Sequence, residues 1–248
     1  MSYEDILEEE FSVAVHDKTK EITFNNAKIV LFNNEEEWVR FRRHRVTGTD
    51  VAKILQYIPG IEKVYLDKVC PCDEMQVNEM SPRMILGREL EPRLPHVCNL
   101  LFNLKFKHIG HFNSVLGEYK GVPLSVSLDG YLVEDNTIYP VEVKCTSPYS
   151  QLGKARNIEE VPNYIKAQIG LQCHLLNVDK LYLVRFTHID NNGLVVFIYR
   201  HNREEYEKQL EIVREFWVKY VIGGEVPEFL RAQNKTRTQD EASNTQTF

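Results

Sequence analysis

The sequence predicts an α/β domain with a mixed central β-sheet flanked by α-helices. The first observation is length, because 248 residues suit one large domain, or one domain with an appendage. The second is composition: 43% hydrophobic and 27% charged residues are ordinary values that exclude collagen-like and fully disordered classes. The third is the order of patterns between residues 122 and 200, which run strand, strand, helix, strand, strand.

The N-terminal part predicts a hairpin followed by two helices. EITF and AKIVLF flank Asn25-Asn26, a pair that tolerates the positive φ angles of a tight turn. Asn34 precedes three glutamates, which suits a helix N-terminus by capping and by the helix dipole. We expect Thr49 to cap the second helix.

The rest of the chain predicts three further helical regions around strands. Ser81-Pro82 opens a helical stretch that Pro92 and Pro95 are expected to kink or divide. VPLSVSLDGYLV, a polar turn and VEVKC together predict an antiparallel hairpin at the centre of the sheet. The remaining elements follow in order: a helix over NYIKAQIGLQCHLL, strands over LYLVRF and LVVFIYR, and a helix over EEYEKQLEIVREFWVKYVIGG.

Charge and composition also predict where the protein works. No stretch reaches the roughly 18 apolar residues of a membrane span, and the acidic start MSYEDILEEEF is unlike a secretory signal. Five scattered cysteines favour reduced thiols, so we expect a cytoplasmic protein that has no membrane partner. The net charge of −6 gives no global attraction to nucleic acid, yet it is compatible with a local basic strip beside metal-binding carboxylates.

The segment VEVKC and the strand before it predict a site for metal-dependent chemistry. Side chains alternate along a strand, so Glu142 and Lys144 share one face. The hairpin brings Asp129 beside them, and the three side chains are expected to converge at one end of the sheet. Two carboxylates could hold Mg²⁺, and the lysine could orient or deprotonate a water molecule. An exposed ladder of solvated Glu and Lys is the alternative interpretation of the same spacing.

SLDG, a short hairpin and VEVKC resemble the Asp…Glu-x-Lys core of the PD-(D/E)xK nucleases, and within them the lambda exonuclease and YqaJ-type viral recombinases. Four further segments follow in the order of that family: RRHRVTGTDVAKIL, GRELEP, NYIKAQIGLQ and FWVKYVIGGEVPEF. The resemblance implies a restriction-endonuclease-like core with a nuclease domain over residues 34–231. Residues 1–33 would form an extension with the hairpin, and residues 232–248 a disordered tail.

The resemblance also implies roles for single residues. Catalytic roles fall on four side chains: Asp129, Glu142, Lys144 and Gln168. Metal ligands are implied at Glu91, Asp129, Glu142 and the backbone carbonyl of Val143. Arg42 and Thr49 are implied to bind a terminal 5′-phosphate. The family's basic residue just after the catalytic lysine has no clean counterpart here, and Lys154 and Arg156 are the nearest candidates.

The implied activity is that of a Mg²⁺-dependent deoxyribonuclease, in which Mn²⁺ can substitute. The enzyme would digest double-stranded DNA ends 5′→3′ and leave a 3′ single strand for a single-strand annealing protein, and the family's homotrimer is implied as an assembly. Two alternatives stand beside it: a site-specific or structure-specific endonuclease on the same fold, and a catalytically inactive DNA-binding module. Circular DNA distinguishes the endonuclease, since an exonuclease needs an end.

Overall fold

The computed structural model describes residues 14–16, 19–56, 58–69, 82–90, 92–187, 193–228 and 230. The strands are β1 (Ala14–His16), β2 (Thr19–Phe24), β3 (Ala27–Leu31), β4 (Val46–Thr47), β5 (Lys107–His108), β6 (Asn113–Tyr119), β7 (Val122–Val126), β8 (Gly130–Glu134), β9 (Thr137–Cys145), β10 (Lys180–Phe186) and β11 (Leu194–Arg200). The helices are α2 (Glu35–Arg43), α3 (Gly48–Gln56), α4 (Ile58–Val69), α5 (Pro82–Leu90), α6 (Leu94–Phe102), α7 (Gln151–Lys154), α8 (Asn163–Leu176) and α9 (Arg203–Phe216), which continues into the π-helix η1 (Trp217–Ile222).

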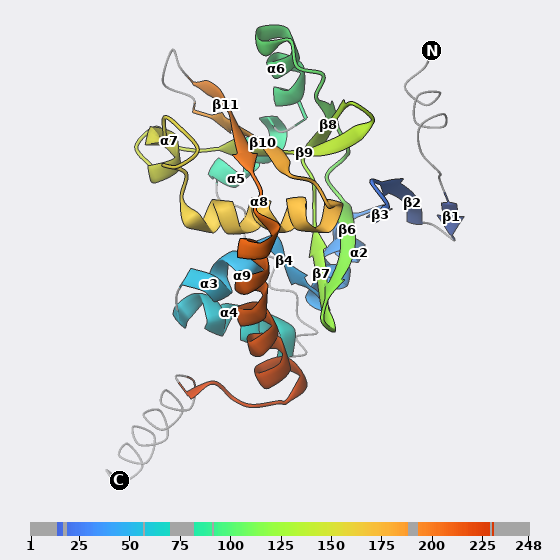
Figure 1. Cartoon of the computed structure of the whole chain (residues 1–248), viewed down its shortest axis with the longest axis vertical. Helices are drawn as coiled ribbons and strands as arrows, with labels where there is room; N and C mark the ends of the chain where they lie inside the picture. The colour runs from blue at the N-terminus through green and yellow to red at the C-terminus, as the bar shows by residue number, and fades with distance from the viewer. Residues whose placement is uncertain are drawn as a thin grey trace, which may run out of the picture.

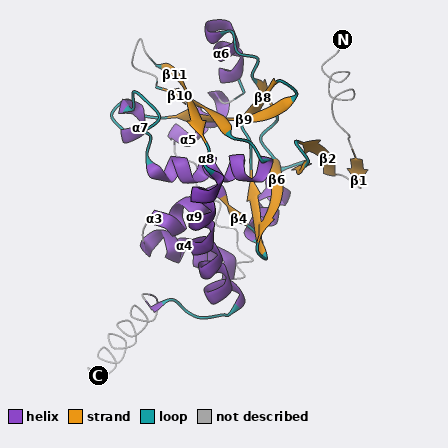
Figure 2. Ribbon diagram, in the orientation of Figure 1, coloured by secondary structure: helices purple, strands orange, loops and turns teal. Residues whose placement is uncertain are grey.

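The strands form two mixed sheets. One has the order β1-β2-β3-β6-β7-β4 and the other the order β11-β10-β9-β8-β5. Each sheet contains one parallel pair, β4 with β7 and β9 with β10. Figure 1 shows α8 running across the molecule, with β8 to β11 on one side and α3, α4 and α9 on the other. The predicted α/β class with mixed sheets and flanking helices is confirmed, but the strands are divided between two sheets instead of forming one (Figure 2).

The predicted N-terminal hairpin is present as β2 and β3. Asn25 and Asn26 take φ angles of 47° and 67°, which suit the turn. The hairpin is joined to the larger sheet because β3 pairs with β6. It also contacts the other sheet, since Asn25 Nδ2 donates to Ile138 O (2.6 Å) and Asn25 Oδ1 accepts from Ile138 N (3.0 Å).

The segment predicted as one long strand before Glu134 consists of two strands in different sheets. β7 ends at Val126 in the six-stranded sheet, and β8 begins at Gly130 in the five-stranded sheet. The fully buried side chain of Asn113 holds the crossing, because its Oδ1 accepts from Leu128 N and its Nδ2 donates to Leu128 O, each at 2.8 Å. Asp129 therefore lies where the chain passes from one sheet to the other.

The helix starts follow local capping, with one correction. Asn34 caps α2 as predicted, since Asn34 Oδ1 accepts from Glu37 N at 2.9 Å. The expectation that Thr49 caps the next helix is wrong. Thr47 takes that position, and its hydroxyl accepts from Asp50 N (3.3 Å) while Asp50 Oδ2 accepts from Thr47 N (3.0 Å). This reciprocal pair satisfies two amides at the helix start and leaves Thr49 exposed in the first turn.

Prolines divide the third helical region as predicted, into α5 and α6. Glu91, between these helices, lies outside the described residues, as does the predicted tail at residues 232–248. α8 spans the predicted segment, and its Ile169, Leu171 and Leu176 are fully buried in the main core. None of the helices that the structure describes is both long and apolar enough to cross a membrane.

Candidate active site

A cleft of about 650 Å³ opens where α2, α3 and α5 meet β9 and α8. Seven of the eight residues to which the resemblance assigns roles line it: Arg42, Thr49, Asp129, Glu142, Val143, Lys144 and Gln168. The eighth, Glu91, lies outside the described residues. The structure thus brings together side chains separated by more than a hundred positions in the chain.

Glu142 lies at the centre of this cleft, on β9. Only 2% of its side chain is exposed, and three donors compensate its charge. Gln168 Nε2 donates to Oε1 at 2.9 Å, Gln172 Nε2 donates to Oε2 at 2.6 Å, and the Lys144 ammonium forms an ion pair with Oε1. The carboxylate is thereby fixed between its own sheet and α8, as a buried charge requires.

Asp129 is held against the same strand. Pairing of β8 with β9 begins at Gly130 and Val141, so the Val143 N–H lies beyond the paired part of β8. Asp129 Oδ2 accepts from this N–H at 2.7 Å. The C=O of a strand residue points to the same side as its N–H. The Val143 carbonyl therefore faces the side of β9 on which Asp129 lies.

Alternation of side chains along β9 determines the position of Lys144. Val141 and Val143 are buried in the apolar layer below the strand, while Glu142 and Lys144 share the opposite face. The predicted shared face is therefore observed, and the 2% exposure of the Glu142 side chain distinguishes it from a solvated surface ladder.

The carboxylate oxygens in the cleft suit a hard divalent cation such as Mg²⁺. Such ions are bound by one or two protein carboxylates together with water and substrate phosphates. A carboxylate accepts about four hydrogen bonds or metal contacts, and Glu142 Oε2 accepts one from Gln172, so capacity for a cation remains there. Asp129 and Glu142 provide two carboxylates, and within the described part of the chain no group of three His, Cys, Asp or Glu side chains forms a metal site.

Arg42 gives the cleft a positive charge, and Thr49 also lines it. The Arg42 guanidinium lies over the Trp38 ring, with its Cζ 4.2 Å from the ring centroid. Burial lowers the pKa of Arg42, while the carboxylates of Asp50 and Asp67 counteract this effect. Beneath it, the buried ammonium of Lys68 donates to Arg42 O (3.3 Å) and pairs with Asp50 (3.1 Å). These contacts link the end of α2 to the start of α3.

Comparison with known families agrees with this geometry. A model of the YqaJ-like viral recombinase domain matches residues 37–177, more than half of the chain. The chain belongs to this family. The match confirms the predicted resemblance and the predicted enzyme class, a DNA exonuclease. No curated protein sequence matches the chain.

Solved structures show the same fold. The YqaJ-family chain is similar to LHK-Exo, an alkaline exonuclease from Laribacter hongkongensis, with a TM-score of 0.59 and 15% identity over 84% of this chain and 99% of that one. The complex of LHK-Exo with dAMP gives a TM-score of 0.57 at 15% identity, over 82% and 99% of the two chains. At this identity the likeness supports the fold alone.

Gln172 is a site residue that the sequence did not single out. It is 1% exposed, lines the cleft and holds Glu142, and its own Oε1 has no hydrogen-bond partner among the described residues. One signal was present, because Gln172 follows Gln168 by four residues and therefore lies on the same face of a helix.

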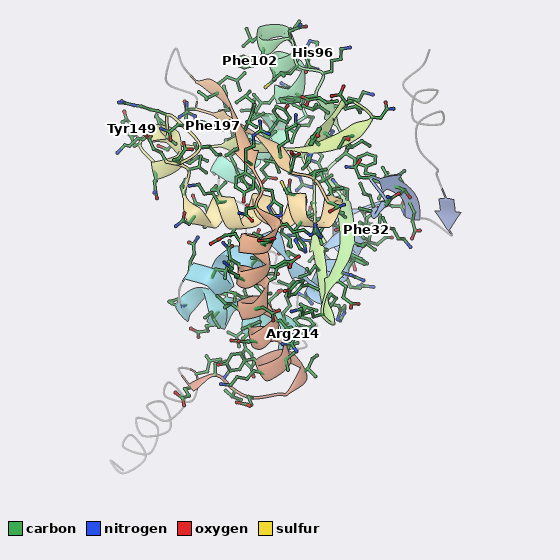
Figure 3. The ribbon with its side chains drawn as sticks, viewed as in Figure 1. Phe32, His96, Phe102, Tyr149, Phe197 and Arg214 are labelled. Atoms are coloured by element: carbon green, nitrogen blue, oxygen red, sulfur yellow. The ribbon has the colours of Figure 1, made fainter. Side chains whose placement is uncertain are left out.

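Arg88 and Glu35 also line the cleft, and neither was predicted. Lys154 and Arg156 do not line the cleft. The sequence had offered them as the nearest counterparts of the family's basic residue after the catalytic lysine. Their segment is fixed elsewhere, because the buried Arg185 of β10 donates to Gly153 O at 2.6 Å and to Ala155 O at 3.0 Å. Figure 3 labels Tyr149, just before this segment, and Phe197, the ring over which the Arg185 guanidinium lies.

Proposed function

We propose that this YqaJ-family protein is a Mg²⁺-dependent exonuclease that digests double-stranded DNA ends 5′→3′. One observation carries the proposal: a single cleft combines two carboxylates, an ammonium group and a glutamine amide with a guanidinium next to a helix start. The carboxylates, the ammonium group and the amide suit phosphodiester hydrolysis. The guanidinium and the helix start suit binding of an anion such as phosphate.

In this proposal Asp129, Glu142 and the Val143 carbonyl hold the cation, and Glu91 completes its ligands. A cation bound there stabilises the negative charge that develops on the attacking and leaving oxygens. The amide donors on Glu142 fix the direction of its carboxylate before substrate arrives, so little reorganisation is needed during the reaction.

Lys144 and Gln168 act on the nucleophile. Lys144 Nζ lies beside Glu142 Oε1, so its N–H groups can orient the attacking water there, and its neutral amine form can accept the proton that this water releases. Gln168 Nε2 contacts the same oxygen, which keeps the amide within reach of this water. Lys144 is the catalytic residue of the pair, and Gln168 orients the attacking water.

Arg42 and Thr49 supply the preference for an end. A guanidinium forms bidentate contacts with phosphate, and the dipole at the N-terminus of α3 favours an anion. A terminal 5′-phosphate held there would place the first phosphodiester of that strand toward the carboxylates. Digestion from this end leaves a 3′ single strand, which suits a partner that anneals single strands in the host cytoplasm, and a homotrimer is the proposed assembly.

The test uses end-labelled linear duplex and covalently closed circular DNA, each with and without Mg²⁺. We expect digestion of the linear duplex alone, dependent on Mg²⁺ and absent in Lys144→Ala. Cleavage of the closed circle would replace the exonuclease by the endonuclease alternative. Lack of cleavage of either DNA would favour the inactive module.

The proposed role of Glu91 has its own control in Glu89. Glu89 lies on α5, and only Glu91 holds the Glu position directly before the proline of the GRELEP segment. We therefore expect Glu91→Gln to abolish cleavage and Glu89→Gln to have little effect. The reverse result would show that the GRELEP segment is aligned incorrectly with its family.

A further inference from the structure

An ion pair joins two helices at the cleft. Glu35 is the first residue of α2, and Arg88 lies on α5, 53 positions later. Arg88 Nη1 donates to both carboxylate oxygens of Glu35 (3.4 and 3.1 Å), and Nη2 donates to Oε2 (3.1 Å). Both residues line the cleft that holds Asp129 and Glu142.

The Arg88 guanidinium has the form of a phosphate ligand. Its fork already binds a planar anion with two nitrogens, which is the geometry used for phosphate. Its Cζ lies 5.5 Å from the centroid of the Phe112 ring, another residue of the cleft lining, which limits the directions that the guanidinium can take. The side chain is 32% exposed, so an incoming ligand can reach it.

Glu35 differs from its neighbours in the first turn of α2. Glu36 pairs with Arg40 on the solvent side, and Glu37 Oε2 accepts from Asn33 N. Glu35 alone of these three lines the cleft, with 51% of its side chain exposed. A carboxylate there repels the phosphates of DNA, yet the pair that it forms is exposed enough to be exchanged at small cost.

We propose that Arg88 binds a backbone phosphate of the DNA and that Glu35 occupies Arg88 until the DNA displaces it. The inference rests on the proposed function, since it takes DNA to be the ligand of the cleft. Glu35 is then an internal competitor that weakens binding of DNA, and Arg88 is a second guanidinium for phosphate beside Arg42.

The experiment measures binding of a short, blunt, fluorescently labelled duplex by anisotropy in EDTA, where no hydrolysis occurs. Glu35→Gln should bind about fivefold more tightly, because an exposed ion pair changes an equilibrium constant by at most about this factor. Arg88→Ala should bind more weakly, and the slope of log affinity against log salt should fall by about 0.9, the loss of one phosphate contact. Arg88→Lys should recover this slope but only part of the affinity, since lysine keeps the charge without the fork.

The double variant Glu35→Gln/Arg88→Ala decides whether Glu35 acts through Arg88. We expect it to bind like Arg88→Ala, whereas a further fivefold gain would show a general charge effect and overturn the proposal. Glu36→Gln is the matched control, and it should bind like the wild type. Wild-type binding with no gain in Glu35→Gln would overturn this inference alone. A wild type that neither binds nor digests the duplex would overturn the proposed function and this inference together.

Discussion

Gln172→Leu tests whether the two glutamines of α8 prepare Glu142 for catalysis. The change keeps the approximate volume and removes the 2.6 Å hydrogen bond from Gln172 Nε2 to Glu142 Oε2. A hydrogen bond to a charged group contributes about 1.5–3 kcal/mol. If this contribution is needed in the transition state, kcat falls roughly tenfold to a hundredfold.

The effect of the same substitution on folding should be small. Gln172 Oε1 is buried without a partner among the described residues, and such an unpaired acceptor costs about 1–3 kcal/mol. Leucine removes this cost together with the hydrogen bond, so the two changes in stability oppose each other. We therefore expect a loss of kcat at nearly constant Tm and constant KM for DNA.

The assay follows initial rates on linear duplex at saturating DNA and Mg²⁺, with thermal unfolding of the same samples. Gln209→Leu is the matched control, a partly buried glutamine on α9 that does not line the cleft. Gln172→Glu should be more damaging than Gln172→Leu, because it places a second carboxylate against Glu142. A kcat of Gln172→Leu within about threefold of the wild type, at unchanged Tm, would refute the reasoning.

Three further predictions concern metal, substrate and pH. Lys144→Ala should abolish cleavage but keep the protein's affinity for Mn²⁺ or Mg²⁺ in calorimetry. Glu142→Ala should lose this metal affinity. Equal metal affinity in Glu142→Ala and the wild type would exclude Glu142 as a ligand. The wild type should digest a 5′-phosphorylated duplex about tenfold to a hundredfold faster than a 5′-hydroxyl duplex, and Arg42→Ala should lose this preference; equal wild-type rates would reject the phosphate pocket. Burial lowers the pKa values of His174 and His201 to about 4 from 6.5, so protonation is disfavoured only in the folded state. Stability present above pH 6.5 should therefore be lost as the pH falls toward 4, and Tm should decline less steeply in His201→Phe.

The local elements followed from the sequence where nearby residues determine them. The asparagine turn and the Asn34 cap depend on side chains within a few positions, and the predicted range of α8 agrees with the structure. The division of the strand before Asp129 could not be predicted in this way, because apolar alternation continues through the segment. Hydrogen bonds from Asn113, about 15 residues upstream, hold the crossing to the second sheet.

Prediction of the site from local sequence patterns was limited in the same way. Strand alternation was sufficient to place Glu142 and Lys144 on one face, and the hairpin turn between Asp129 and these residues placed Asp129 nearby. Gln168 was identified by resemblance, and Gln172 was missed because a second buried glutamine on a helix has many structural uses. The Glu35 and Arg88 pair depends on how α2 and α5 meet, and no local pattern contains that contact.

The two halves of the cleft are connected through α8. A Cβ on Gly48, at the start of α3, would lie 3.0 Å from Gln168 Cγ and 3.3 Å from Gln168 O, so glycine permits the close approach of the two helices. Gln168 in turn holds Glu142 on β9. The spacing between the proposed phosphate pocket and the carboxylates is therefore set by one helix that contacts both. An exonuclease that starts from a phosphorylated end needs this spacing to be constant, because it determines which phosphodiester lies at the carboxylates when the end is bound.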